Sequence, residues 1–137
     1  FASLFYIGLT LGRFLGGFLM DKYCDRDMIR MGVSVLIFGI ILLIPSKHEL
    51  FFLSGLVLIG LGCAPIYPAF LHNTANKFGN EDSGSIMGMQ IASAYLGSML
   101  IPPLYGFLAR GFGFKILPLY LSIFTLLILF TTEKVFQ

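Results

Sequence analysis

Long apolar runs separated by short charged clusters are the main pattern in this chain of 137 residues. The charged side chains gather at residues 21–30, 47–49, 77–82, 110–115 and 133–134. About 20 apolar residues in a helix cross a hydrocarbon layer of roughly 30 Å, so the runs between the clusters can span a membrane. The pattern predicts five transmembrane helices, near residues 1–20, 28–46, 50–77, 84–109 and 114–132.

Composition supports an all-α, polytopic membrane helix bundle with almost no soluble part. Hydrophobic residues make up 57% of the chain and charged residues only 12%, against roughly 25% charged in a soluble domain. The expected partner of this surface is the lipid bilayer, and the net charge of +2 gives no indication of nucleic acid. The two cysteines fall in a loop and in a span, so no disulfide framework is expected. We expect no cofactor and no metal.

Lysine and arginine are distributed unevenly over the two sides of the predicted bundle. One side carries Lys22, Arg26, Arg30, Lys77 and Lys134, and the other carries Lys47, Arg110 and Lys115. Because basic residues are enriched in cytoplasmic loops, we expect loop 21–30 and the C-terminus to be cytoplasmic. The expected location is the cell membrane, as a multi-pass protein.

The first span has two different faces. Ser3, Tyr6, Thr10, Arg13 and Gly17 follow one another at intervals of 3, 4, 3 and 4 residues, which places them on one helical stripe. Three glycines spaced four apart form a second stripe on roughly the opposite side: Gly8, Gly12 and Gly16. Small residues at this spacing let helices approach closely. We therefore expect one face to pack against a helix and the other to meet a polar environment.

Polar residues also occur in the third and fourth spans, whereas the second and fifth are nearly free of them. Polar side chains at membrane depth usually face the bundle interior or a water-filled cavity. We expect the first, third and fourth spans to line an internal space that the other two shield. Pro65 and Pro68 should break the third span. The candidates for the substrate path are Tyr6, Thr10, Arg13, Tyr67, Gln90 and Ser93; each could instead be an ordinary bundle residue.

A weak internal repeat relates the first and fourth spans. Five identities share an offset of 89 residues: Tyr6, Gly8, Gly17, Phe18 and Leu19 match Tyr95, Gly97, Gly106, Phe107 and Leu108. The same offset places the apolar second span on the apolar fifth. Three-helix units in opposite orientation are a common transporter architecture. Under this interpretation the first unit lacks its first helix, which would explain an odd number of spans and a start on Phe1.

The stretch that follows the first span resembles the signature of the major facilitator superfamily, approximately G-x-x-x-D-[RK]-x-G-x-[RK]. Gly17, Asp21 and Lys22 match, Cys24 replaces the second glycine, and Arg26 stands one step beyond the last basic position. This degraded form resembles the copy in the C-terminal half, so the chain would hold helices eight to twelve over residues 1–137. The missing N-terminal half would then be a partner.

The resemblance also implies a mechanism and a site. Secondary active transport by alternating access uses a cytoplasmic latch, here Gly17, Asp21, Lys22 and Arg26. Asp25 and Asp27 are interpreted as plain solvated charges. "GLGCAPIYPAFLHNTANKFG" and "GSIMGMQIASAYLGSMLIPPLYGFLA" resemble bacterial fucose-permease-like sugar transporters, which implies sugar transport, as symport with a proton. An arginine four residues before Gly17 equally resembles carriers of small organic anions.

Arg13 would lie roughly 12 Å deeper than Asp21, near the bilayer centre. A cation there costs roughly 2.5–3.5 kcal/mol on insertion scales, so it needs a partner. The apolar stretches of the last three spans hold no Asp or Glu. The partner of Arg13 would therefore come from the missing half or from the substrate, or backbone carbonyls and water would take its place. His72 is the one titratable candidate for coupling, and we expect it near the cytoplasmic interface. A coupling carboxylate would then belong to the N-terminal half.

Two further classes of function compete with transport. A membrane-embedded enzyme needs paired carboxylates, a Ser/His pair or an H-x-x-x-H motif at depth, and the sequence has none. We therefore expect no enzymatic activity. An inactive truncated remnant or a membrane scaffold remains an alternative. It predicts that replacing Arg13 by leucine is neutral for function.

Overall fold

The computed structural model describes residues 2–44 and 48–137, and within them the chain is α-helical without strands. The all-α prediction is confirmed. The elements are α1 (Ala2–Met20), α2 (Asp25–Leu43), α3 (Glu49–Cys63), α4 (Ile66–Phe112), the short 3₁₀ turn η1 (Phe114–Ile116) and α5 (Leu117–Val135).

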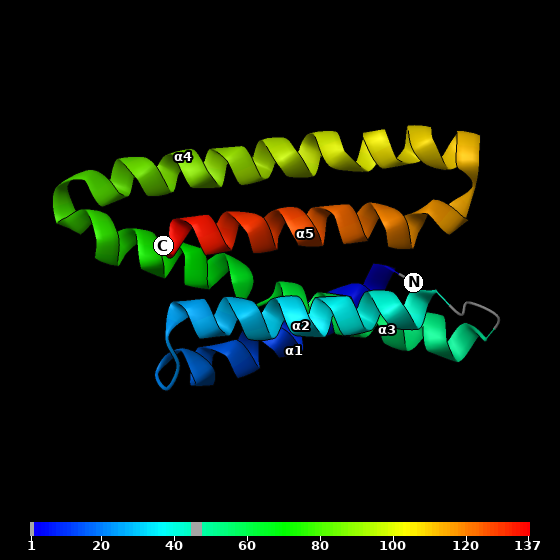
Figure 1. Cartoon of the computed structure of the whole chain (residues 1–137), viewed down its shortest axis with the longest axis horizontal. Helices are drawn as coiled ribbons and strands as arrows, with labels where there is room; N and C mark the ends of the chain where they lie inside the picture. Colours follow the sequence, from blue (N-terminus) through cyan, green and yellow to red (C-terminus); the bar gives the residue numbers. More distant parts are fainter. Residues whose placement is uncertain (1, 45–47) are drawn as a thin grey trace.

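The third predicted span is broken where its first proline stands. α3 ends at Cys63 and α4 begins at Ile66, because Pro65 lacks the N–H that would continue the helical hydrogen bonds. A second interruption lies within α4 at Gly79, whose φ of 72° and ψ of −174° are accessible essentially only to glycine. The chain reverses direction there (Figure 1). We call residues 66–78 α4a and residues 80–112 α4b.

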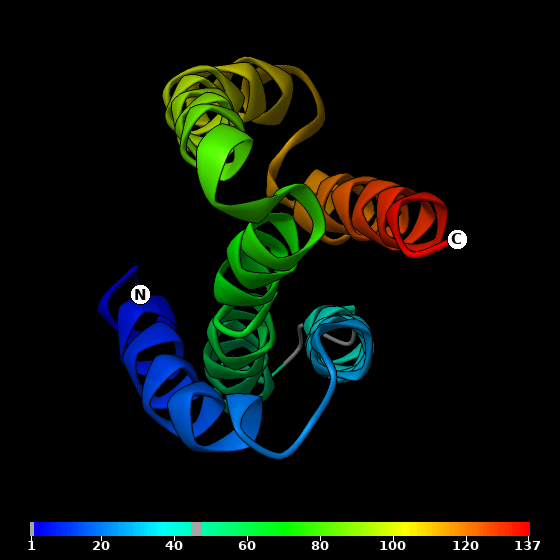
Figure 2. The same ribbon diagram turned by 90° about the vertical axis from the view of Figure 1, so that its left-hand side faces the viewer.

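The helices lie side by side, along the long direction of the molecule (Figure 1). Seen end-on, α1 lies to one side of the α3–α4a column and α2 and α5 lie to the other, whereas α4b lies beyond the upper end of the column (Figure 2). The expectation that the second span is a peripheral shield is wrong, because α2 supplies most of the buried core.

The core is centred on α2, which the sequence analysis did not predict. One face of α2 is buried against α3 and supplies most of the buried side chains: Met28, Ile29, Val33, Leu36, Ile40 and Leu43, with Ile59 of α3 opposite. The opposite face exposes large apolar residues such as Phe38 and Ile41. Beyond Ser34 both faces are apolar, so hydrophobicity there could not separate the buried face from the one available to lipid.

Glycines form the contact between α1 and α3, as the stripe predicted. A Cβ added at Gly12 would lie 2.5 Å from the Cβ of Ala64, and one at Gly8 would overlap the carbonyl of Val57. From the other side, a Cβ at Gly60 would overlap the carbonyl of Phe5. Gly17, on the other stripe, has no neighbour within 4 Å. The packing face of α1 is therefore confirmed, whereas the polar environment of the other face stays a prediction.

Within residues 2–44 and 48–137, four helical segments are long and apolar enough to cross a membrane: Ser3–Met20, Glu49–Gly79, Glu81–Phe112 and Phe114–Val135. α2 does not meet this measure over its described residues, because Asp25, Arg26, Asp27 and Arg30 fall in its first two turns. Beyond Arg30 it carries no charged side chain up to Leu43. The chain is a multi-pass membrane protein.

Candidate functional site

The polar stripe of α1 faces away from the rest of the chain. Ser3, Tyr6, Thr10, Arg13 and Gly17 are all exposed, since the opposite glycine stripe is packed against α3. The Arg13 guanidinium makes no hydrogen bond or ion pair with any residue in the described part of the chain. Among residues 2–44 and 48–137, no carboxylate forms an ion pair with it.

The neighbours of Arg13 on the stripe are arranged to leave it accessible. The Thr10 hydroxyl donates to the Tyr6 carbonyl at 2.8 Å, so its hydrogen satisfies the helix backbone while the oxygen can still accept a bond. The Tyr6 side chain is 62% exposed. Thr10 and Tyr6 therefore present polar atoms one and two turns from Arg13, on the same face.

The other predicted path residues come from α4. Tyr67 lies exposed in the first turn of α4a. Gln90 of α4b donates from Nε2 to the hydroxyl of Thr74 at 2.8 Å, which bridges the two arms of α4 across Gly79. Ser93 donates to the Met89 carbonyl at 2.8 Å.

The structure brings together only part of the predicted set. Thr10 contacts Tyr6 by hydrogen bond, and Gln90 contacts Thr74, which is buried. Among the described residues, no hydrogen bond or ion pair connects Arg13 with Tyr67, Gln90 or Ser93. Arg13 comes from α1 at the side of the α3–α4a column, whereas Gln90 and Ser93 come from α4b beyond its upper end (Figure 2).

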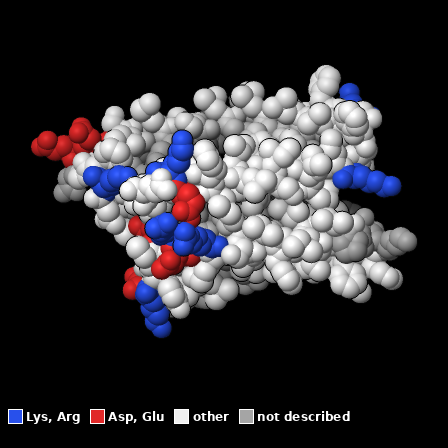
Figure 3. All heavy atoms as spheres, viewed as in Figure 1, with Lys and Arg blue, Asp and Glu red and all other residues white. Residues whose placement is uncertain are grey.

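Most charged side chains on the face shown in Figure 3 gather at one end of the molecule, and fewer lie at the other. The charged end holds the α1–α2 turn, the α4a–α4b turn and the end of α5, which are the three segments expected on one side of the membrane (Figure 1). Lys47, which entered the charge comparison, lies outside the described residues.

The four residues predicted to form a latch have different environments. Gly17 is open, and Asp21 and Lys22 lie exposed in the turn after α1, with side chains that have no partner in the described part of the chain. Arg26 is different, because its Nη2 donates to Oε2 of Glu133 on α5 at 3.0 Å. Of this set, only Arg26 is engaged within these helices.

Asp25 was wrongly interpreted as a solvated charge. His72 of α4a approaches both of its oxygens, at 3.0 Å and 2.9 Å from Nδ1, and the Asp25 side chain is only 15% exposed. The pair links the start of α2 to α4a at the charged end, so His72 lies with the end charges as expected. Asp27, by contrast, is exposed.

Sequence reasoning missed the partner that α5 supplies. Glu133 accepts hydrogen bonds from Arg26 and from Arg30, one turn further along α2. Lys77 of α4a donates to the Val135 carbonyl at 3.0 Å and so reaches the end of α5 as well. The sequence contains one indication of this contact. Arg26 and Arg30 are four residues apart, which places two cations on one helix face.

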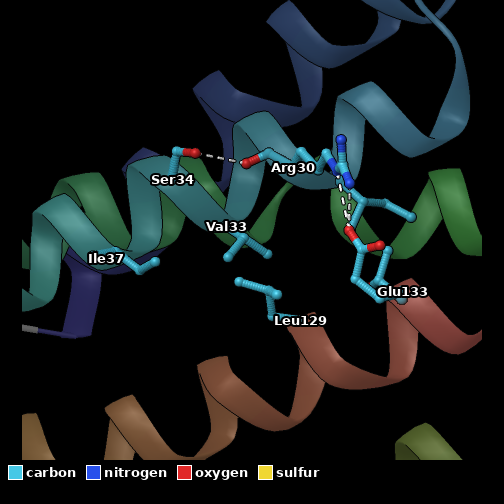
Figure 4. A pocket seen from close by; sticks show the side chains of 8 residues that line it. Arg30, Val33, Ser34, Ile37, Leu129 and Glu133 are labelled. Atoms are coloured by element: carbon cyan, nitrogen blue, oxygen red, sulfur yellow. Dashed lines mark hydrogen bonds and ion pairs between the residues drawn. The ribbon is translucent and has the colours of Figure 1, made fainter.

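A groove of about 220 Å³ lies between α2 and α5, next to this ion pair (Figure 4). Its wall is mostly aliphatic, with Arg30 and Glu133 at one end and Ile37 towards the other (Figure 4). The lining residues are Ile29, Arg30, Val33, Ser34, Ile37, Leu129, Thr132 and Glu133. Over residues 2–44 and 48–137, no group of three His, Cys, Asp or Glu side chains could hold a metal ion.

Comparison with known proteins gives a family match over nearly the whole chain. The model of a family described as "Major Facilitator Superfamily" matches residues 1–135. A protein named "Probable nitrate transporter NarT" from Staphylococcus aureus strain bovine RF122 / ET3-1 is 26% identical over 137 residues, and the one from strain JH9 is 25% identical. Each alignment covers 99% of this chain but 35% of the relative. The chain thus spans about a third of the length of these curated relatives. No solved structure matches it.

Proposed function

Because this chain belongs to the Major Facilitator Superfamily, we propose that it serves in the secondary transport of a small solute across the cell membrane by alternating access. We assign it to the C-terminal half, as helices eight to twelve of a twelve-helix permease. The degraded signature at Gly17, Asp21 and Lys22 motivates this placement, and the match to about a third of longer relatives supports only that the chain is part of a larger permease. In this assignment the N-terminal half of the same permease is a partner of the chain.

The proposed class of substrate rests on the guanidinium of Arg13, which has no partner among the described residues. It projects from a helix that is fixed on its other face by the Gly8 and Gly12 contacts with α3. A permanent cation at membrane depth requires a counter-charge, and the described residues of this chain offer none. We propose that the counter-charge is the substrate, a small anion of the nitrate class.

The chemistry of arginine suits such an anion. Guanidinium is planar and donates two parallel N–H bonds to a planar oxyanion. It is also more weakly hydrated than an ammonium group, which lowers the cost of a dry site. The names of the relatives, "Probable nitrate transporter", support the anion over the sugar that the fucose-permease resemblance implied. No comparison supports sugar transport or symport, so both remain expectations from sequence.

Around Arg13 we place Tyr6 and Thr10 on the same stripe, with Tyr67, Gln90 and Ser93 contributed from α4. At the charged end, Asp21 and Lys22 are free to meet the other half of the permease, while Arg26 is held by Glu133. This division favours Asp21 and Lys22 as the moving part of the latch, with Arg26 as its fixed base. The charged end is proposed to be cytoplasmic.

Uptake by the intact permease in proteoliposomes tests the assignment. We expect saturable uptake of nitrate and little uptake of labelled fucose. Replacing Arg13 with Gln should lower nitrate uptake at least about tenfold, because a charge-assisted hydrogen bond is lost. Arg110→Gln removes an exposed cation at the other end of the molecule and should leave uptake unchanged.

Membrane insertion of both variants is measured by surface labelling, so that loss of protein is not taken for loss of transport. Normal nitrate uptake by Arg13→Gln would overturn the role of this residue. Saturable fucose uptake without nitrate uptake would restore the sugar assignment. Uptake of neither solute by a correctly inserted protein would favour the scaffold or remnant alternative.

A further inference from the structure

The internal repeat of the sequence has a counterpart in the burial of α1 and α4b, the two helices that it relates. The glycine stripe of α1 is buried at its three positions: Gly8, Gly12 and Gly16. An offset of 89 residues carries these positions onto Gly97, Ile101 and Tyr105 of α4b. Those three residues are partly shielded, whereas most of the residues between them are exposed. The same face of each helix is therefore turned towards protein.

The stripe of α1 is buried by α3. A Cβ added at Gly8 would overlap the carbonyl of Val57 in α3, and one at Gly12 would meet Leu61 as well as Ala64. In the three-helix units of the repeat, α3 belongs to the first helix of the second unit, and α1 is the second helix of the first unit. The first helix of one unit thus packs on the second helix of the other.

The corresponding stripe of α4b has no such cover within the described chain. The nearest atom that a Cβ at Gly97 would meet belongs to Ile101 of the same helix, at 3.7 Å, and over residues 81–112 no residue is buried. The hydroxyl of Tyr105 is shielded from solvent but has no hydrogen-bond partner among the described residues. Shielded polar groups in folded proteins nearly always have a partner. The stripe therefore combines an open glycine with a hydroxyl that requires a polar neighbour.

We propose that the stripe of Gly97, Ile101 and Tyr105 is the contact surface for one further transmembrane helix of the same permease. This upstream helix is the first helix of the repeat unit that contains α1 and α2, and it packs on α4b as α3 packs on α1. The inference rests on the proposed placement of the chain in a larger permease; the chain covers only 35% of its relatives, which leaves length for such a helix.

The chemistry of the stripe favours a helix over lipid. A glycine at the contact lets two helix backbones approach closely, as Gly8 does in α1. Hydrocarbon tails offer no hydrogen-bonding group, so lipid would leave the Tyr105 hydroxyl without a partner. In the proposed contact, the upstream helix approaches at Gly97 and supplies a polar group to Tyr105.

Photo-cross-linking in the intact permease tests the identity of the partner. p-Benzoylphenylalanine is introduced at Ile101, and the captured peptide is identified by mass spectrometry. We expect capture of a segment within about 30 residues before residue 1, because a transmembrane helix and a short loop have this length. Leu96 is the matched control position, since it is 60% exposed and lies off the stripe, and the reagent there should not capture this segment. Capture from Ile101 of a different segment, of lipid alone or of a second copy would overturn the proposal.

Two substitutions of glycine by leucine test the close contact. Gly97→Leu should lower the melting temperature of the intact permease, because the added side chain meets the upstream helix. Gly111→Leu adds the same atoms to the same helix, but off the stripe and with no neighbour within 4 Å, and it should be tolerated. A melting temperature that Gly97→Leu leaves at the wild-type value would show that no helix packs at this position.

Tyr105→Phe tests the polar part of the contact, because it removes the hydroxyl and keeps the ring. If the upstream helix supplies a partner, the variant loses a hydrogen bond and should melt at a lower temperature. An unchanged or higher melting temperature would contradict this part of the proposal. None of these measurements depends on uptake. A permease that fails to transport nitrate would therefore refute the proposed substrate without affecting the helix contact.

Discussion

Nη2 of Arg30 lies 2.5 Å from Oε1 of Glu133, although 103 residues separate them in the chain. The contact joins the second turn of α2 to the end of α5. Arg26 holds the other carboxylate oxygen at 3.0 Å, so one carboxylate connects two positions of α2. Because α2 also carries the core against α3, this contact fixes α5 to the most buried part of the molecule.

Reversing the charges of this pair should show whether the contact stabilises the bundle. We expect Glu133→Arg to lower the melting temperature of the detergent-solubilised permease, because a third cation would then replace the carboxylate that Arg26 and Arg30 share. Adding Arg30→Glu to it should recover part of the loss. The effect should be modest, since the groups are partly exposed and screened by solvent. Equal melting temperatures for the single and the double variant would argue against a direct interaction.

The glycine contact between α1 and α3 gives a second prediction. Gly12→Leu should destabilise the protein by about 1–3 kcal/mol, because the added side chain overlaps Ala64 and the two helices must separate. Gly17→Leu adds the same atoms to the same helix, but into open space. The two variants are compared by heating each one and measuring, by size-exclusion chromatography, the fraction of protein that stays folded. Equal loss from both substitutions would contradict the contact.

The chain reversal at Gly79 predicts a strong preference for glycine. Gly79→Ala forces a side chain into a conformation that costs about 1–3 kcal/mol, and we expect a lower yield of folded protein. Gly84→Ala, five residues on in α4b, has no neighbour within 4 Å and no positive φ. It should be tolerated. If both variants give the wild-type yield, the two arms of α4 do not require this backbone geometry.

The Asp25–His72 pair predicts a difference between two aspartates of one helix turn. Asp25→Ala removes the partner of His72 and should lower thermal stability. Asp27→Ala, at an exposed position, should have little effect. A melting curve of each purified variant makes the comparison, and a larger loss from Asp27→Ala would refute the assignment of the pair.

Orientation can be read from Cys24, which is exposed in the turn between α1 and α2. If the charged end is cytoplasmic, a membrane-impermeant thiol reagent should label Cys24 in inside-out vesicles but not in intact cells. Cys24→Ser identifies the signal, since it removes only this thiol. Labelling of Cys24 in intact cells would invert the proposed topology.

The sequence alone determined the helical class, the approximate bounds of most helices, the break at Pro65 and the glycine face along which α1 packs. These features depend on local chemistry: hydrophobic length, a missing backbone donor, and the recurrence of small or polar residues at helical spacing. The lone cation of Arg13 was visible for the same reason, since the nearby apolar stretches contain no carboxylate. Its proposed role in binding an anion remains a prediction.

Only the tertiary structure decided which charges meet and which face of α2 is buried. Asp25 and His72 are 47 residues apart, and Arg30 and Glu133 are 103 residues apart. No local pattern indicates such pairs, because they depend on how separate helices are placed side by side. The burial of α2 has the same cause. A helix that is apolar on both sides does not specify which side faces protein, so the packing of α3 and α5 against it makes that choice.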